Sequence, residues 1–189
     1  MREIIEIIKK DVLMYLDMLD TTKRHSKCTV KDYIHVRIKY PVFKFVVCMR
    51  ICYWIEMVKF LKPIYYLLKL EFRHLQIKYG IQTGHRLNPG GGFFIGHFGG
   101  IVIHEGATIG ERVIIHQNTS IGTTDRGVPC IGNNVTIGAN VCVIGNVKIG
   151  NNCTIGAGSI VTNFFPDNSI LVCNPAKKIG TKPEGGHKF

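Results

Sequence analysis

Aliphatic residues recur at every sixth position through the second half of this 189-residue chain. A six-residue period fits neither the 3.6-residue turn of an α-helix nor the two-residue alternation of a strand. It is typical of a solenoid in which each hexad supplies one short strand and one turn, with the aliphatic side chain stacked inside the coil. The positions in register are Ile103, Ile109, Ile115, Ile121, Ile131, Ile137, Val143, Ile149, Ile155 and Val161.

The corners and the breaks of this repeat are informative in different ways. Gly commonly follows the aliphatic residue, and Gly and Asn can adopt the positive φ that a sharp corner often needs. The register is interrupted by two extra residues between Gly96 and Val102, and by four more within 123–130. A stacked wall resists insertions, so we expect these two interruptions to carry function.

The first half has a different character. Gly is absent before Gly80 and dense after it, which marks a change of architecture. Apolar residues at helical spacing, with Pro41 and Pro63 near helix starts, predict a helical domain. The expected helices cover residues 4–19, about 42–60 and about 63–78, with a polar loop at 21–31. We therefore expect an α+β chain with a helical domain at 1–80, a solenoid domain at 81–180 and a tail at 181–189.

Charge is divided unevenly between the halves. Residues 1–90 hold 17 Lys and Arg against 8 Asp and Glu, a net +9, whereas residues 91–189 hold 7 against 5, a net +2. The basic half predicts an anionic partner or a solvated helix face, and no motif for binding nucleic acid accompanies it. An aromatic stripe from Tyr53 to Phe72 predicts core or subunit interface, and the alternative is an amphipathic surface on anionic lipid.

Two absences bear on the expected compartment. No apolar run reaches the ~18 residues of a membrane span, and charges interrupt the N-terminal segment that a signal peptide would need. The seven cysteines form no CxxC pair, so we expect free thiols in a reducing cytoplasm. The sequence thus predicts a cytoplasmic protein, with peripheral contact at the inner membrane face left open.

Several segments together resemble one enzyme family. The hexads resemble those of left-handed parallel β-helix acyltransferases, and the stretch around Tyr40-Pro41 and Arg50 is similar to the helical part of serine acetyltransferases. Residues 95–103 (IGHFGGIVI) look like the catalytic His strand of that family. Gly138-Ala139-Asn140, Gly156-Ala157-Gly158-Ser159 and Asn174-Pro175-Ala176-Lys177 look like its cofactor-binding coils and terminal turn. The resemblance implies a left-handed β-helix, acetyl-CoA as co-substrate, and an acetyl-CoA-dependent O-acetyltransferase.

The chain departs from the serine acetyltransferase pattern at three places. Gly96 stands where the family has Asp before its His, the loop at 125–129 lacks the family's second His, and the chain ends in Phe189 rather than Ile. The pattern looks closer to capsule and exopolysaccharide relatives of the colanic-acid type. We therefore expect a hydroxyl of a sugar or polysaccharide precursor as the acceptor. L-serine is the alternative acceptor, and a non-enzymatic β-helix scaffold at a membrane surface is a second alternative.

Acetyl transfer to a hydroxyl needs a base, and a His with a pKa near 6.5 suits that task. His97 is the candidate because it lies in a break of the repeat beside glycines. Glu105, at the position of a family Glu, is a candidate to orient it, although a backbone carbonyl is equally suitable. His116, at a corner usually held by Gly, is a further active-site candidate. No metal site is expected, because no Cys/His cluster exists.

The remaining site candidates follow from the loop and from the resemblance. Gly122 and Thr123 open the insertion loop and could supply a backbone N–H to the thioester oxygen. Asp125 and Arg126 in that loop are candidates to bind the acceptor.

The resemblance puts the pantetheine arm against Ala139 and Ala157, and the CoA phosphates near Lys177. It also implies a homotrimer with active sites between neighbouring β-helices, and helices that could pair two trimers.

Overall fold

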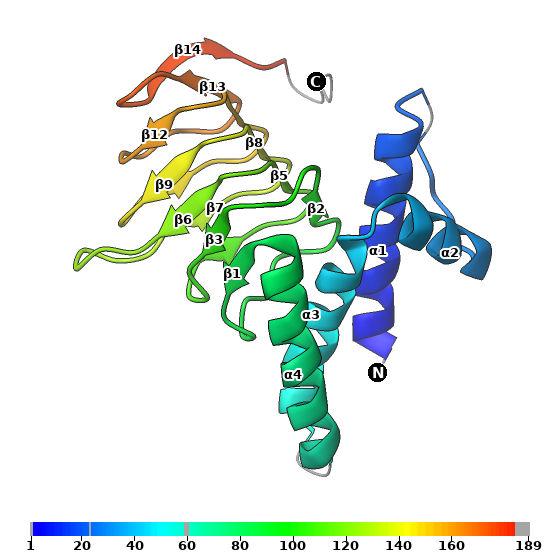
Figure 1. The fold of residues 1–189 in the computed structure, drawn as a ribbon. Coiled ribbons are helices and arrows are strands. Elements are labelled where there is room, and N and C mark those ends of the chain that lie inside the picture. Colours follow the sequence, from blue (N-terminus) through cyan, green and yellow to red (C-terminus); the bar gives the residue numbers. More distant parts are fainter. Residues whose placement is uncertain (1, 23, 59–60, 184–189) are drawn as a thin grey trace.

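The computed structural model describes residues 2–22, 24–58 and 61–183, with four helices followed by a parallel β-helix. The helices lie at one end of the β-helix and the C-terminal strand lies at the other (Figure 1). The helices are α1 (Arg2–Leu19), α2 (Val30–Lys39), α3 (Phe43–Glu56) and α4 (Lys62–Tyr79). The predicted order of a helical part and a hexad solenoid is confirmed.

Three sheets form the three faces of the β-helix, and all pairings are parallel except the last. The first face contains β1 (Ile81–Thr83), β3 (Ile101–Ile103), β6 (Ser120–Gly122), β9 (Cys142–Ile144) and β12 (Ile160–Val161). The second face contains β2 (Phe94–Ile95), β5 (Ile114–Ile115), β8 (Thr136–Ile137), β11 (Thr154–Ile155), β13 (Ser169–Val172) and β14 (Lys177–Thr181). The third face contains β4 (Thr108–Ile109), β7 (Cys130–Ile131) and β10 (Lys148–Ile149).

The core of the β-helix is the stack of hexad side chains. Every one of the ten aliphatic positions is buried, with exposures of 4% or less. Fully burying one such side chain is worth about 1.5–3 kcal/mol, so the repeat itself stabilises the coil. Thr119 and Ser159, each two residues before an aliphatic position, are also buried inside the coil. Their hydroxyls donate to the backbone oxygens of His116 and Gly156.

The corners differ from the prediction in one respect. The positive φ falls on the third residue after the aliphatic position, mostly Asn, and not on the Gly that directly follows it. That Gly is required by close approach: a Cβ at Gly138 would lie 2.7 Å from the backbone nitrogen of Ala157 in the next coil. The side chains at positive φ are Arg112, Asn118, Asn134, Asn140, Asn152 and Asn168. Asn tolerates this conformation better than most residues, which explains its recurrence.

The helical part differs from the prediction at several boundaries. Val30 and Lys31, expected in a loop, begin α2, which starts with a capping box between Thr29 and Asp32. The predicted tail begins inside β14, and its residues 184–189, with Phe189, lie outside the described residues.

The members of the aromatic stripe, predicted as core or subunit interface, differ in exposure within one chain. Phe72 is buried and Tyr66 is 64% exposed, whereas Phe60 falls outside the described ranges.

A buried ion pair joins the helices to the first coil. The carboxylate of Asp11 on α1 accepts from Arg50 on α3 at 3.0 and 3.1 Å, and from the backbone N–H groups of Gly92 and Phe93 at 2.8 and 2.9 Å. Arg50 also donates to the backbone oxygens of Pro89 and Gly90. Neither side chain is more than 2% exposed. Each of these buried charges depends on the other, because an unpaired charge in the interior has an unfavourable free energy.

Replacing Asp11 by Asn tests this junction. The amide keeps an oxygen for the two N–H groups but leaves Arg50 without its counter-charge, so we expect the free energy of unfolding to fall by about 3–5 kcal/mol. Urea unfolding measures the change. The control is Lys9→Gln, which removes an exposed ion pair with Glu6 and should cost less than about 1 kcal/mol. Equal losses in the two variants would contradict the assignment.

Candidate active site

The corner between the second and first faces holds the candidate base and the residues predicted to bind the cofactor on one edge of the β-helix. Ile95, Ile115, Ile137 and Ile155 pair in register, so the corner residues that follow them are stacked coil on coil. We call this line the His97 edge. Its first row is Gly96, His116, Gly138 and Gly156. Its second row is Gly99, Gln117, Ala139 and Ala157, and His97 and Phe98 are the two extra residues of the first coil, between Gly96 and Gly99.

Glycines shape the segment that presents His97. Gly99 and Gly100 both have positive φ, at 110° and 65°, which turns the chain sharply after His97. Phe98 packs edge-on against Tyr79 of α4, with ring centroids 5.1 Å apart. The side chain of His97 is exposed at this corner, where a ligand could reach it.

His116 is the only side chain with a ring contact to His97 in the described part of the chain. The two imidazole centroids are 5.7 Å apart and the rings are tilted by 33°. Burial lowers the pKa of the half-buried His116, and the nearby charge of protonated His97 lowers it further. His116 therefore stays neutral beside His97 at neutral pH.

The His116 ring also explains the Gly at position 96. A Cβ on Gly96 would lie 2.8 Å from Cε1 and 2.9 Å from Nδ1 of His116. A carboxylate side chain at 96 would need the very space that this ring fills. In this structure the His116 ring of the next coil therefore leaves no room for the Asp that the serine acetyltransferase pattern has at this position.

The other candidates lie on a different corner. Glu105, Thr123, Asp125 and Arg126 occupy the corner between the first and third faces, which we call the loop edge. The insertion loop projects from the prism there (Figure 1), closed by a bridge between Thr124 and Gly127. Asp125 and Arg126 are both exposed, and the Arg126 N–H donates to the Thr124 hydroxyl at 3.2 Å.

Glu105, predicted to orient His97, lies apart from it within one chain, and its role stays a prediction. The two residues lie at opposite ends of β3, because His97 precedes the strand and Glu105 follows it. Glu105 instead packs over Gly84, where a Cβ would meet its carboxylate, and interacts with Arg86. Gly122 and Thr123 are likewise at the loop edge and away from His97 in the same chain.

Lys177 lies at the far end of the His97 edge. It pairs with Val172 in the antiparallel β13–β14 ladder, and Val172 follows the coil position that pairs with Ile155. Its side chain is exposed. Across the described ranges, no group of three or more His, Cys, Asp or Glu side chains is arranged to hold a metal ion.

Comparison with known proteins agrees with this geometry. The family model described as bacterial transferase hexapeptide (six repeats) matches residues 131–163. A serine acetyltransferase of Synechococcus elongatus is 35% identical over 150 residues, covering 77% of this chain and 60% of the relative. Residues 131–163 of the solenoid thus match the hexapeptide-repeat model, and the chain is similar to serine acetyltransferases. A Staphylococcus aureus serine acetyltransferase is 42% identical over 108 residues, covering 55% of this chain and 48% of the relative.

Solved structures extend the likeness to the helices. Serine acetyltransferase from Neisseria gonorrhoeae superposes with a TM-score of 0.76 at 24% identity, over 96% of this chain and 66% of the other. The soybean enzyme complexed with serine gives a TM-score of 0.77 at 23% identity, over 95% and 70%. At this level of sequence identity, the similarity shows the fold alone. The chain spans less than two thirds of the length of both sequence relatives, and these relatives give no support to the capsule and colanic-acid type.

The packing of Gly96 against His116 can be tested by a double-mutant cycle. Gly96→Ala forces the His116 ring to move, so we expect the free energy of unfolding to fall by about 1–3 kcal/mol. In a His116→Gly background the same change should cost clearly less, giving a coupling of about 0.5–3 kcal/mol. Urea unfolding of the four proteins measures it.

Gly122→Ala is the matched control. A Cβ at that corner would meet the nearest side chain, Ile144, at an ordinary 3.4 Å. Strictly additive effects of the Gly96 and His116 substitutions would show that the two positions are not in contact.

Proposed function

We propose that this protein is an O-acetyltransferase that moves an acetyl group from acetyl-CoA to a hydroxyl of a small acceptor. The observation that carries the proposal is the His97 edge, where the exposed imidazole of the first coil lies on the same edge as the small residues Ala139 and Ala157 of later coils. The hexapeptide repeat and the serine acetyltransferase relatives support the same activity.

His97 acts as the general base in this proposal. Its imidazole accepts the proton of the acceptor hydroxyl as the oxygen attacks the thioester carbonyl, and it returns that proton to the departing CoA sulfur. Direct attack needs no acetylated protein side chain. Such help from a positioned base is typically worth about 10²–10⁴-fold in rate.

His116 is a positioning residue rather than a second base. As a neutral ring it leaves His97 free to take a proton without facing a second positive charge. It fills the corner that a carboxylate would use in an Asp-His pair, and it supports the His97 ring from one side.

The proposed acetyl-CoA site runs along the His97 edge. The pantetheine arm would lie against Ala139 and Ala157, whose small side chains leave a slot. Lys177, at the end of that edge, suits the CoA phosphates. A solved relative described as a complex with CoA supports this choice of co-substrate.

We also propose a homotrimer, because the candidate residues fall on two edges of one prism. The His97 edge and the loop edge bound opposite sides of the first face. A closed three-fold assembly would bring the loop edge of one copy beside the His97 edge of the next, where Gly122 or Thr123 could supply an N–H to the thioester oxygen. Asp125 and Arg126 would then bind the acceptor. Pairing of two trimers, a cytoplasmic location and contact with a membrane stay predictions.

L-serine is the acceptor favoured by the comparisons, over the sugar hydroxyl that the departures predicted. The relatives are named serine acetyltransferases, and one similar structure holds serine. A sugar hydroxyl is the second candidate, on the specific ground that Gly96 and the loop at 125–129 lack the family's acidic and second His side chains.

Replacing His97 by Ala tests the proposed base. We expect kcat/KM for acetyl transfer to fall by about 10²–10⁴-fold, with the affinity for acetyl-CoA little changed, because the base acts on the acceptor proton. Release of the CoA thiol measures turnover and calorimetry measures binding. His35→Ala, which removes an exposed imidazole on α2, is the control. Unchanged turnover in His97→Ala would refute the role.

The acceptor can be identified in one assay. We expect the purified protein to consume acetyl-CoA with L-serine and to yield O-acetylserine by mass spectrometry. Nucleotide-sugars and oligosaccharides are offered in parallel, and faster turnover with one of them would reverse the order of the two candidates. Absence of acetyl-CoA binding would favour the non-enzymatic scaffold instead.

A further inference from the structure

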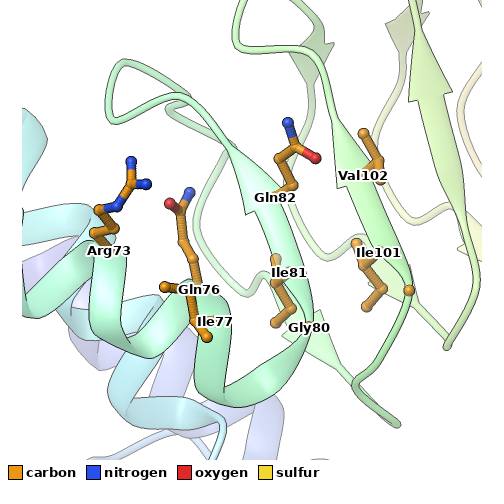
Figure 2. Close-up of a pocket in the computed structure, with 9 residues that line it drawn as sticks. Arg73, Gln76, Ile77, Gly80, Ile81, Gln82, Ile101 and Val102 are labelled. Atoms are coloured by element: carbon orange, nitrogen blue, oxygen red, sulfur yellow. The ribbon is translucent and has the colours of Figure 1, made fainter.

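Two adjoining cavities lie between α4 and the first coil of the β-helix. One has a volume of about 520 Å³ and the other about 290 Å³, and they share Arg73 and Gln76 of α4. Figure 2 shows Arg73 and Gln76 from the helix and Gln82 from β1 extending to the same side of the larger cavity. Gly100, in the turn after His97, lines the larger cavity, but no residue placed in the proposed acetyl-transfer site is among the described residues that line either cavity.

The charged side chains lining these cavities are cationic. Arg73 and Lys69 are one helical turn apart on α4, so they face the same cavity, and His85 lies at its far side. No acidic side chain is among the described residues that line either cavity.

The nearest acids are already balanced. Glu56 accepts from Arg86 at 3.0 Å and lies 3.4 Å from His85, and Glu105 interacts with the same Arg86. Glu71 on α4 is paired with Lys44.

Arg73 and Lys69 are the cations left unneutralised. Within the described ranges Arg73 has no ion pair or hydrogen bond, and Lys69 has no carboxylate partner: it has a cation–π contact with Tyr65 at 5.2 Å and an electrostatic interaction with Cys52. Other basic side chains at this junction, such as Lys10 and Arg50, are taken by Glu111 and Asp11. An exposed guanidinium with an ammonium one turn away forms a ready receptor for an anion.

We propose that this basic pocket binds the phosphate group of a phosphorylated organic ligand. A phosphate presents several acceptor oxygens and close to two negative charges, which suits the guanidinium fork of Arg73 together with the point charge of Lys69. The larger cavity continues past Gln76 to the apolar side chains of Ile77, Ile81 and Val102, which would contact the organic body. A soluble phosphate ester and a phospholipid headgroup share this chemistry.

The test measures binding rather than acetyl transfer, so its outcome is independent of the proposed function. Inorganic pyrophosphate is titrated calorimetrically in the presence of saturating CoA, which keeps the cofactor site occupied. In parallel, co-sedimentation is measured with phosphatidylcholine vesicles containing or lacking phosphatidylglycerol. The proteins are the wild type, Arg73→Gln, Lys69→Gln with Arg73→Gln, and the control Lys39→Gln, which removes an exposed positive charge on α2.

We expect the double variant to bind at least tenfold more weakly than Lys39→Gln to one of the two probes. Selective loss of pyrophosphate binding would support a soluble ligand, and selective loss of binding to anionic vesicles would support a lipid headgroup. Circular dichroism checks that each variant is folded, and Arg73→Gln alone serves if the double variant is not. Binding of both probes that is absent, or equal in the Arg73 variants and Lys39→Gln, would overturn the proposal.

Discussion

The close stacking of successive coils is the constraint on which the rest of the structure depends. Parallel strands hold the coils at backbone hydrogen-bonding distance, about 4.8 Å apart, so a corner residue of one coil lies directly over that of the next. At Gly138 and Gly156 there is no room for a Cβ. The same stacking brings His97 to the same edge of the β-helix as Ala139 and Ala157, although they are far apart in sequence.

The helices depend on that first coil as well. Asp11 reaches from α1 to the backbone of Gly92 and Phe93 while Arg50 reaches from α3 to the same turn. The Tyr15 hydroxyl accepts from the N–H of Ile95, immediately before the corner that carries His97. These contacts cover the first-coil end of the β-helix, and the hydrogen bond to Tyr15 holds the segment that leads into His97.

The repeat could be predicted from the sequence, but the contacts between residues of different coils could not. Hexad positions from Ile103 to Val161 could be read because one inward side chain per strand is enforced by burial. Helix α2 was missed, although Thr29 and Asp32 have the spacing of a capping box. The role predicted for Glu105 rested on its spacing from His97 along the chain, and β3 separates the two residues within one chain. The contact of His116 with Gly96 depends on coil register and could not be read from either residue alone.

The His97 edge has a consequence for how such a protein can change its ligand. Each coil contributes one step of about 4.8 Å along this edge, so Ile95, two residues before the base, and Ile155, three coils on, are about 14 Å apart. The length of this edge can therefore change only in whole coils. Duplicating or deleting one coil on the C-terminal side of Ala139 would lengthen or shorten the surface available to a bound molecule by one coil. The imidazole of His97 and the glycine turn after it would stay unchanged.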